Sequence, residues 1–563
     1  LSSAASDVYK RQIKCNSKTF RNNIKRLEEA RKDIPNLNDK KARYFQQRII
    51  MNFFYNVYTE ASSVESLEVY LQDHSDELYD IYASRYNVLS EASDDIDKFV
   101  QLKFKCYSQL DFSSTQNRSF LLIMLDLAER LNLQGAMARL ARLVSDEGIK
   151  ITSRMQAGLS FVYPKPSTAD DLIEKFDDIC SLLQIAIEEE EDSILPSLVT
   201  FLNYYSAVVG SLHPTKALIV KGRFLEALEQ NKYPFLNDVK DVCKIDVNNK
   251  RAYEQLQEAI DLLNCQNLSA SPFTSDEPYL IEEGTEYANW INSANKCFDT
   301  IRQHAVAHAS DNFDKGRGVN PITEEQGLYN YLKNYGNMHK AKIQSALAEP
   351  FPQQFDQPLT IIDWGCGQGL ASMLFCEKYY QENINQIILI DPSELAIKRA
   401  SLHCKAINSE CSVRTVCKKL DDVELNDIGI IRNNVVVNLF SNILDIDDYS
   451  TPHILSLMEG IKKAENYYVC VSPHINDIKT NKIDNFRRYF QTMSGYVEFH
   501  NVDNTKLSEF WMCNNVFKSG SINHGLQYGC SPYHDENGCA KKWTRVLRVF
   551  KAVSYTHLRA HET

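Results

Sequence analysis

The chain is expected to form an α/β domain with a doubly wound parallel sheet, preceded by an all-α region of helical hairpins. From residue 359 onward, short apolar runs alternate with helical stretches. Strands that interleave with helices give a parallel sheet covered on both faces. Residues 13–265 instead repeat apolar side chains at three- and four-residue spacing, with almost no strand-like alternation. That pattern predicts stacked helix pairs.

The composition fits an ordinary globular protein. Of the 563 residues, 44% are hydrophobic and 24% are charged. The net charge of −12 argues against a broad basic surface for naked nucleic acid, although a local basic patch stays open. No apolar run of about 18 residues is present, so no membrane span is expected. The 15 cysteines are scattered, which is typical of reduced thiols in a cytoplasmic protein.

Both ends of the chain read as translated sequencing adapter. Residues 2–12 and 553–563 match in-frame translations of the two adapters of a transposon-based library. We therefore expect a metagenomic fragment whose natural part runs from about Ile13 to Ala552. An extension beyond either end stays open.

The natural part divides into regions of different composition. The all-α region is followed by a Ser- and Pro-rich stretch, which is typical of a linker. The acidic run Glu188–Asp192 is interpreted as a solvated helix end, with an acidic docking site as the alternative. The expected units are residues 13–265 (helical), 266–320 (linker and helix) and 321–552 (α/β), the last with a core at 358–475 and a substrate-region insertion at 476–540.

Individual elements follow from local signals. One helix is expected over Glu286–Ala309. A second should start at Thr323–Gln326, which has capping-box spacing, and should end before Pro350. The predicted strands are Leu359–Asp363, Gln386–Asp391, Val413–Val416, Asn434–Leu439, Tyr467–Ser472 and Trp543–Lys551, and the predicted helices between them are Leu370–Tyr380, Ser393–Ile407, Pro452–Ala464 and Asp484–Thr492. Right-handed crossovers then place a ligand at the carboxyl ends of the strands.

A glycine-rich loop follows the first predicted strand. The segment Thr360–Gly369 runs from an apolar strand through Asp363 into three alternate glycines, Gly365, Gly367 and Gly369. Glycines permit tight turning and a close approach of the backbone to a ligand. The segment resembles motif I of class I S-adenosylmethionine-dependent methyltransferases.

This resemblance covers residues 358–552 and implies a doubly wound, Rossmann-like methyltransferase sheet. It implies that the loop, Cys366 included, wraps the methionine part of S-adenosylmethionine. Asp363 would orient the loop and the ammonium group of the ligand.

Acidic residues end the next two strands. Asp391 follows the segment Gln386–Ile390 and could accept hydrogen bonds from both ribose hydroxyls of the cofactor. The family often binds the adenine amino group after the third strand, where this chain has Asp421 and Asp422. Either of these acids could serve, and the other would then be solvated.

A nicotinamide-binding dehydrogenase is the alternative to a methyltransferase. Its fingerprint spaces the glycines as Gly-x-Gly-x-x-Gly, whereas position 370 here is Leu. The Asp two residues before the first glycine is also uncommon in that class. The spacing therefore favours the methyltransferase interpretation.

The fourth and fifth strands limit the chemistry. The motif of amino-methylating DNA enzymes is absent, because its place reads Asn438-Leu-Phe-Ser441. No Pro-Cys pair supplies a nucleophile for carbon-5 methylation, and Cys470 is interpreted as a buried core thiol. An oxygen or nitrogen acceptor on RNA, protein or a small molecule remains. Asn438 and Ser441 could face it, or cap the next helix. His474 could be a base, or a surface residue in a turn.

A group of cysteines and histidines lies near the C-terminus. Its spacing could suit zinc or an iron–sulfur cluster, or the thiols could be free in an insertion that shapes the substrate pocket. No metal is assigned. The candidate ligands are Cys513, Cys530, His534 and Cys539, with His524 among them.

The leading hypothesis is therefore an active methyltransferase whose helical half recruits the substrate or a partner, RNA or protein. A modest basic cluster keeps RNA plausible, and it consists of Arg487, Arg488, Lys541, Lys542 and Arg545. The alternative is a helical scaffold or binding protein with a non-catalytic methyltransferase-like domain. The intact glycine loop and Asp391 favour the enzyme, since decay usually removes them.

Overall fold

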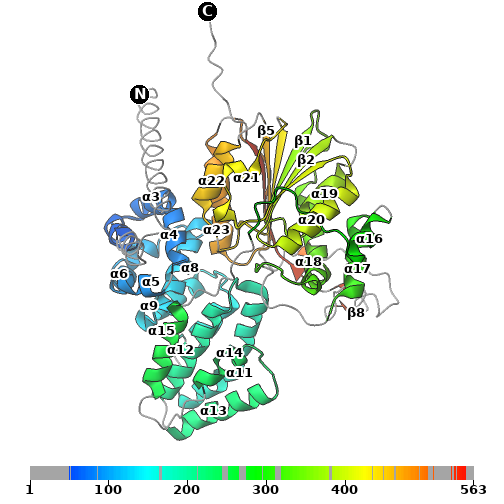
Figure 1. Ribbon diagram of the computed structural model, residues 1–563. Helices are drawn as coiled ribbons and strands as arrows, with labels where there is room; N and C mark the ends of the chain where they lie inside the picture. Colours follow the sequence, from blue (N-terminus) through cyan, green and yellow to red (C-terminus); the bar gives the residue numbers. More distant parts are fainter. Residues whose placement is uncertain are drawn as a thin grey trace, which may run out of the picture.

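The computed structural model describes two regions, one built from helices and one built around a sheet (Figure 1). The described residues are 50, 52–84, 86–163, 168–211, 214–243, 252–265, 274–293, 296–310, 319–379, 383–433, 435–447, 449–461, 465–493, 495–504, 511–512, 534–535, 538–539 and 542–552. Both adapter-like ends lie outside these ranges. None of the helices in these ranges is long and apolar enough to cross a membrane.

The N-terminal half is helical throughout its described part. Its helices are α3 (Val64–Asp73), α4 (Ser75–Tyr82), α5 (Tyr86–Leu89), α6 (Ser93–Leu102), α7 (Phe104–Tyr107), α8 (Thr115–Arg130), α9 (Gln134–Asp146), α10 (Ser153–Ser160), α11 (Ala169–Ile185), α12 (Leu195–Ser211), α13 (Pro214–Glu229), α14 (Leu236–Cys243) and α15 (Ala252–Cys265). Side chains of Ser63 and Thr168 cap α3 and α11. Apolar faces pack into two cores, one around α8 and one around α12.

The second half carries a seven-stranded sheet. Its strands are β1 (Leu359–Trp364), β2 (Ile384–Ile390), β3 (Ser412–Val416), β4 (Val435–Ser441), β5 (Glu465–Ser472), β6 (Val497–Asn504) and β11 (Arg545–Ala552). Their order is β3-β2-β1-β4-β5-β11-β6, and β11 runs antiparallel to both neighbours. The first five strands are parallel. The doubly wound, Rossmann-like fold is therefore confirmed.

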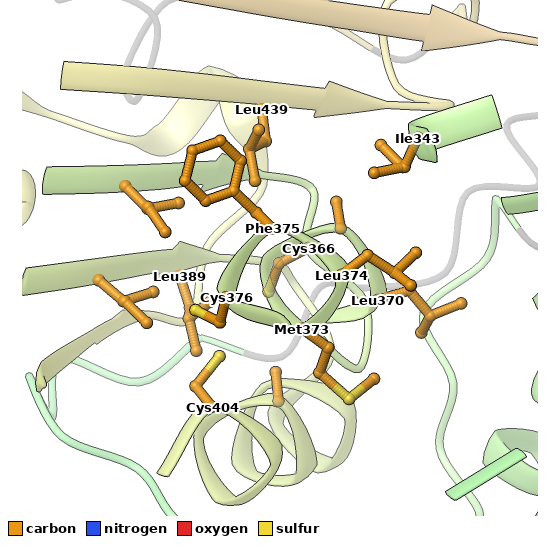
Figure 2. Packing of buried hydrophobic residues seen from close by; sticks show 14 of the residues in the cluster. Ile343, Cys366, Leu370, Met373, Leu374, Phe375, Cys376, Leu389, Cys404 and Leu439 are labelled. Atoms are coloured by element: carbon orange, nitrogen blue, oxygen red, sulfur yellow. The ribbon is translucent and has the colours of Figure 1, made fainter. Parts of the chain in front are cut away.

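Helices cover both faces of this sheet. They are α16 (Glu286–Asn292), α17 (Phe298–His308), α18 (Glu325–Ala346), α19 (Leu370–Lys378), α20 (Glu394–Ile407), α21 (Leu425–Ile428), α22 (Thr451–Gly460) and α23 (Asp477–Gln491). On one face α19 is buried from Leu370 to Cys376. Figure 2 shows Phe375 of α19 among the strand residues Leu389 and Leu439, with Ile343 of α18 nearby. On the other face α22 and α23 cover a core around Trp364.

The connections place a crevice at the carboxyl edge of the sheet. From β1 the chain first moves outward to β2 and β3, and it then returns to the other side of β1 as β4. Such a reversal leaves loops diverging at the carboxyl ends of β1 and β4, where ligands of open α/β sheets bind. The glycine loop follows β1 at this point.

Several element boundaries differ from the sequence prediction. The single helix expected over Glu286–Ala309 is two helices, α16 and α17, because Cys297 has extended backbone angles. The N-cap of α18 is Glu324 and makes no side-chain capping bond, so the predicted capping box at Thr323 is wrong. Two further short pairs, β7 (Trp511–Met512) with β10 (Lys542–Trp543), and β8 (His534–Asp535) with β9 (Gly538–Cys539), lie outside the main sheet.

Part of the predicted insertion is regular structure. Residues 477–504, expected in a substrate-region insertion, form α23 and the edge strand β6. Asn476 caps α23 by accepting from the Lys479 amide, so this helix begins seven residues before the predicted start at Asp484. β6 was missed because its side chains are mostly polar and at least partly exposed, which hides the alternation of a strand.

Candidate functional site

The three loop glycines meet three different steric demands. All have positive φ, at 66° for Gly365, 51° for Gly367 and 79° for Gly369. A Cβ at Gly365 would lie 2.5 Å from Cδ1 of Ile443, and one at Gly369 would lie 3.2 Å from the Ala400 Cα. A Cβ at Gly367 would meet nothing within 4 Å. Gly367 thus borders open space, while the other two allow close packing of the chain.

Asp391 lies directly after β2 and holds the glycine loop. Its Oδ2 accepts from the Gly367 amide at 2.8 Å, and its Oδ1 accepts from the Ser393 amide at 2.8 Å. Each carboxylate oxygen keeps a second lone pair for a ligand. Burial raises the pKa of Asp391 to about 6, although both backbone hydrogen bonds oppose the rise.

Asp363 lies beneath the loop and is fully buried. Its Oδ2 accepts from the amide of Ser372 at 3.2 Å and from its hydroxyl at 2.7 Å, in the first turn of α19. This arrangement ties β1 to the helix that the glycine loop starts. Its Oδ1 is buried and makes no hydrogen bond among the described residues. Burial raises the pKa of Asp363 to about 7.

Two neighbouring helices fix the loop through residues that the sequence prediction missed. The Gln368 side-chain amide donates to the Leu328 carbonyl of α18 at 3.0 Å. The Gln368 carbonyl lies 2.8 Å from His403 Nδ1 of α20, and His403 Nε2 lies 2.7 Å from the Tyr287 hydroxyl. Burial lowers the pKa of His403 to about 3, so the ring is neutral and bridges the two groups. These contacts join distant parts of the sequence, so no local motif announces them.

Cys366 also lies in the loop. It is buried, and burial raises its thiol pKa, with Asp391 and Asp363 adding to the effect. The thiol therefore stays protonated and is a poor nucleophile.

Several polar side chains lie together at the carboxyl end of β4, and we name them the β4-end cluster. It consists of Tyr331, His339 and Lys342 from α18, with Ser441 and Asn442. His339 Nδ1 lies 2.7 Å from the Asn442 side-chain nitrogen and 3.5 Å from the Ser441 hydroxyl. The Tyr331 hydroxyl is 3.0 Å from His339 Nε2, and the fully buried Lys342 donates to Asn442 Oδ1.

This cluster combines a neutral imidazole with a buried lysine. Burial lowers the pKa of His339 far below its usual range, and the charge of Lys342 lowers it further. His339 is thus a hydrogen-bond acceptor at neutral pH. Asn442 has φ 57°, an uncommon backbone conformation for a residue other than glycine. Of this cluster only Ser441 was proposed as a site residue from the sequence. The aromatic and histidine spacing of α18 was the available signal.

The remaining catalytic candidates lie inside the fold. Asn438 is buried in the sheet, where it accepts from Trp364 Nε1 at 3.2 Å and donates to the Tyr467 carbonyl. His474 is buried as well, so the turn that holds it does not expose it. Its Nδ1 lies 3.0 Å from the Thr480 hydroxyl, and burial lowers its pKa to about 4. Cys470 is buried, and burial raises its pKa.

The two acids after β3 have different surroundings. Asp421 is partly buried, and its Oδ1 accepts from the Ser450 amide, the N-cap residue of α22, at 2.8 Å. Asp422 is exposed. Asp421 therefore stabilises the start of α22.

The predicted basic cluster is engaged within the protein. Arg487 contacts Glu498 and Asp484, and Arg488 donates to Gln116 at 2.6 Å. Arg545 donates to Asn504 and to the Ser345 hydroxyl. Lys541 lies outside the described residues, and only the backbone of Lys542 is described. The arginines therefore form internal contacts rather than an open patch for RNA.

The side chains of the candidate metal ligands lie beyond the part of the chain that the structure describes. Cys513, His524 and Cys530 lie outside the described residues. The backbones of His534 and Cys539 pair across β8 and β9. Among the described side chains, no three His, Cys, Asp or Glu residues are placed to hold a metal ion.

Known proteins add little to this geometry. No protein-family model matches the chain. The plantazolicin methyltransferase in complex with SAH is 11% identical, with a TM-score of 0.23, and the match covers 39% of this chain and 85% of that one. A putative class I S-adenosylmethionine-dependent methyltransferase from Listeria monocytogenes is 11% identical, with a TM-score of 0.24, over 68% of this chain and 88% of that one.

A modification subunit of a putative type I restriction enzyme from Vibrio vulnificus is 9% identical, with a TM-score of 0.25, over 83% of this chain and 81% of that one. Scores this low carry no argument. The fold is therefore assigned from the strand order of the chain itself.

Proposed function

We propose that the α/β half binds S-adenosylmethionine and transfers its methyl group to an oxygen or nitrogen nucleophile. One observation carries the proposal. The Asp391 carboxylate is hydrogen-bonded to the Gly367 amide, and Gly367 faces open space at the point where the strand order reverses. A ligand in this place could lie against the loop backbone and donate its ribose hydroxyls to Asp391.

The residues present fit such a cofactor. A Cβ at Gly367 would occupy the free space beside the loop, so glycine keeps room for a ligand. Asp391 keeps acceptor capacity on both oxygens, because each accepts one hydrogen bond from the described residues and a carboxylate oxygen can accept two. When bound, the cofactor supplies an electrophilic methyl group on a sulfonium. The protein itself must align the acceptor and exclude water.

The acceptor side is assigned to the β4-end cluster. It lies where β4 ends, and its loop packs against the glycine loop, because Ile443 occupies the space next to Gly365. Neutral His339 can accept a hydrogen bond from an acceptor hydroxyl or amine and so align it, with Tyr331 orienting the ring. The positive charge of Lys342 favours an acceptor that carries or develops negative charge.

Calorimetric titration of the full chain tests the proposal. S-adenosylmethionine and S-adenosylhomocysteine should both bind, and NADH should not. Asp391→Ala should weaken the binding by roughly 1–3 kcal/mol, because two charge-assisted hydrogen bonds are lost. Glu394→Gln is the matched control, since this neighbouring carboxylate only pairs with Lys398 on the surface of α20. A folded protein that binds neither sulfur compound would favour the scaffold alternative.

A further inference from the structure

The segment after β4 contacts the helical half of the protein. This segment, residues 442–447, is named the β4 loop. The backbone amide of its last residue, Asp447, donates a hydrogen bond to Asp192 Oδ2 at 3.1 Å. Asp192 belongs to the acidic run that was predicted to be a solvated helix end. The predicted solvated helix end or loop is confirmed for Glu188 and Glu189, which are exposed, but it is wrong for the end of the run, where Glu191 pairs with Arg154 at 3.0 Å.

One buried lysine links the two halves at this place. Lys479 of α23 lies 2.7 Å from Asp192 Oδ2 and 2.7 Å from Asp447 Oδ1. Its side chain is 5% exposed, and that of Asp192 is 10% exposed. An ammonium group so far from water is stable only when carboxylates surround it. In this Asp192–Lys479–Asp447 bridge, both carboxylates must therefore stay close to the Lys479 ammonium group.

Tyr79 of the helical half makes a second contact with the β4 loop. Its hydroxyl donates to Asp447 Oδ1. Lys482 lies beneath, with its ammonium group 4.4 Å from the Tyr79 ring and 3.7 Å from the Tyr449 ring, and it donates to the Ile446 carbonyl. Tyr79 of the helical half therefore holds Asp447, and Lys482 of the α/β half holds the adjacent Ile446.

The opposite end of the same loop belongs to the candidate site. Asn442 is a member of the β4-end cluster, and Ile443 lies so close to Gly365 that no Cβ would fit between them. Asp445 accepts from the Ser472 hydroxyl at 2.8 Å, which fastens the middle of the loop to β5. A displacement at Asp447 would therefore be transmitted over a short, packed segment to the glycine loop.

The two halves are also fixed to each other nearby. Figure 1 shows α23 between the sheet and the helical half. Arg118 of α8 binds both carboxylate oxygens of Asp477, at 2.8 and 3.0 Å. Ile478 is fully buried in the hydrophobic core of the helical half. The helical half is therefore packed firmly enough to position the loop.

We propose that Asp192 and Tyr79 are positioning residues, through which the helical half sets the conformation of the β4 loop and of the candidate cofactor site. The loop-positioning part stands on the described contacts alone. The cofactor part rests on the proposed function.

Hydrogen exchange of the full chain tests the loop-positioning part. Asp192→Asn and Tyr79→Phe should each raise amide exchange at residues 443–447 by roughly tenfold or more, since fastening contacts are lost. Asp170→Asn is the matched control, because that aspartate pairs with Lys216 on the exposed surface of the helical half. Unchanged exchange in the loop of both variants would overturn the proposal, whether or not a cofactor binds.

Calorimetric titration with S-adenosylhomocysteine tests the cofactor part. Asp192→Asn should weaken binding by roughly 3- to 10-fold, as expected for a modest coupling between sites. Val208→Ala, in the helical core remote from the loop, controls for lowered stability and should leave the affinity unchanged. Faster loop exchange with unchanged affinity would overturn the link to the cofactor site. No binding by the wild-type protein would instead refute the proposed function, and the exchange result would still decide the positioning role.

Discussion

Single carboxylates determine how the candidate site responds to pH. Asp363 is buried beneath the glycine loop and Asp391 is partly buried beside it, and their removal from water raises their pKa values to about 7 and about 6. In such a folded protein the protonated form is favoured relative to the unfolded chain. These two groups therefore make the ligand-free protein less stable as the pH rises through their pKa values.

Cofactor affinity should fall when the pH is lowered below about 6. Only the ionised form of Asp391 offers all its lone pairs to ribose hydroxyls, so binding should release protons near its pKa of about 6. The affinity should drop by up to roughly tenfold per pH unit between pH 6 and 4. Titration calorimetry in buffers of different ionisation enthalpy measures the released protons. Asp391→Asn should show no such release near pH 6, and an unchanged profile in this variant would contradict the assignment.

Asp363→Asn should change the pH dependence of stability. The wild-type protein loses stability between pH 5 and about 7, because folded Asp363 keeps its proton up to its pKa of about 7 while the unfolded chain has already released it. The neutral variant escapes this loss. Relative to wild type it should gain roughly 2–3 kcal/mol over that interval, as measured by chemical unfolding at pH 5 and pH 8. An equal difference at pH 5 and pH 8 would refute the assigned pKa.

At the scale of elements, different glycines of the glycine loop serve stability and binding: Gly365 allows close packing, and Gly367 leaves room for a ligand. Gly367→Ala adds a methyl group where nothing lies within 4 Å, whereas Gly365→Ala places one 2.5 Å from Ile443. Both lose the positive φ that glycine permits, at a cost of about 1–2 kcal/mol. Gly365→Ala should lower the thermal midpoint further, and Gly367→Ala should abolish cofactor binding while the protein stays folded. Equal midpoints for the two variants would contradict this difference.

Most of the sheet could be predicted from the sequence because its central strands are largely apolar, and the polar edge strand β6 was the exception. β1 and β4 are buried over nearly all of their lengths and run directly into the polar loops of the candidate site. The glycine loop and Asp391 were likewise visible as local motifs. His339 and Lys342 could not be assigned, because nothing in α18 shows that it lies against the end of β4.

Charged side chains account for the other missed features. α23 begins with Asp477, Lys479 and Lys482, all buried, and the helical half provides the partners that make their burial tolerable. A prediction from hydrophobic periodicity places such charged residues on the solvent-exposed face of a helix. The end of the acidic run before α12, Glu191 and Asp192, was predicted to be solvated for the same reason. Whether a charged side chain is buried or solvated depends on partners far away in the sequence, and a single sequence does not reveal these partners.

At the scale of the whole molecule, the two halves should unfold together. α8 and α23 share the core around Ile478 and the ion pair between Arg118 and Asp477. Differential scanning calorimetry of the full chain should show one cooperative transition. Arg118→Ala should lower the midpoint of this transition and the stability by about 1–3 kcal/mol, because the buried Asp477 loses its partner. Two separate transitions in the wild-type protein would contradict a shared core.

The position of β11 has a consequence for synthesis on the ribosome. This strand follows β6 in the chain, yet it lies between β5 and β6 and is the sole described partner of β6 in the sheet. While the chain is being translated, β5 therefore presents an unsatisfied edge until residues 545–552 leave the exit tunnel. Unpaired edges invite aggregation. The nascent chain should thus depend on chaperone shielding until its last strand is inserted.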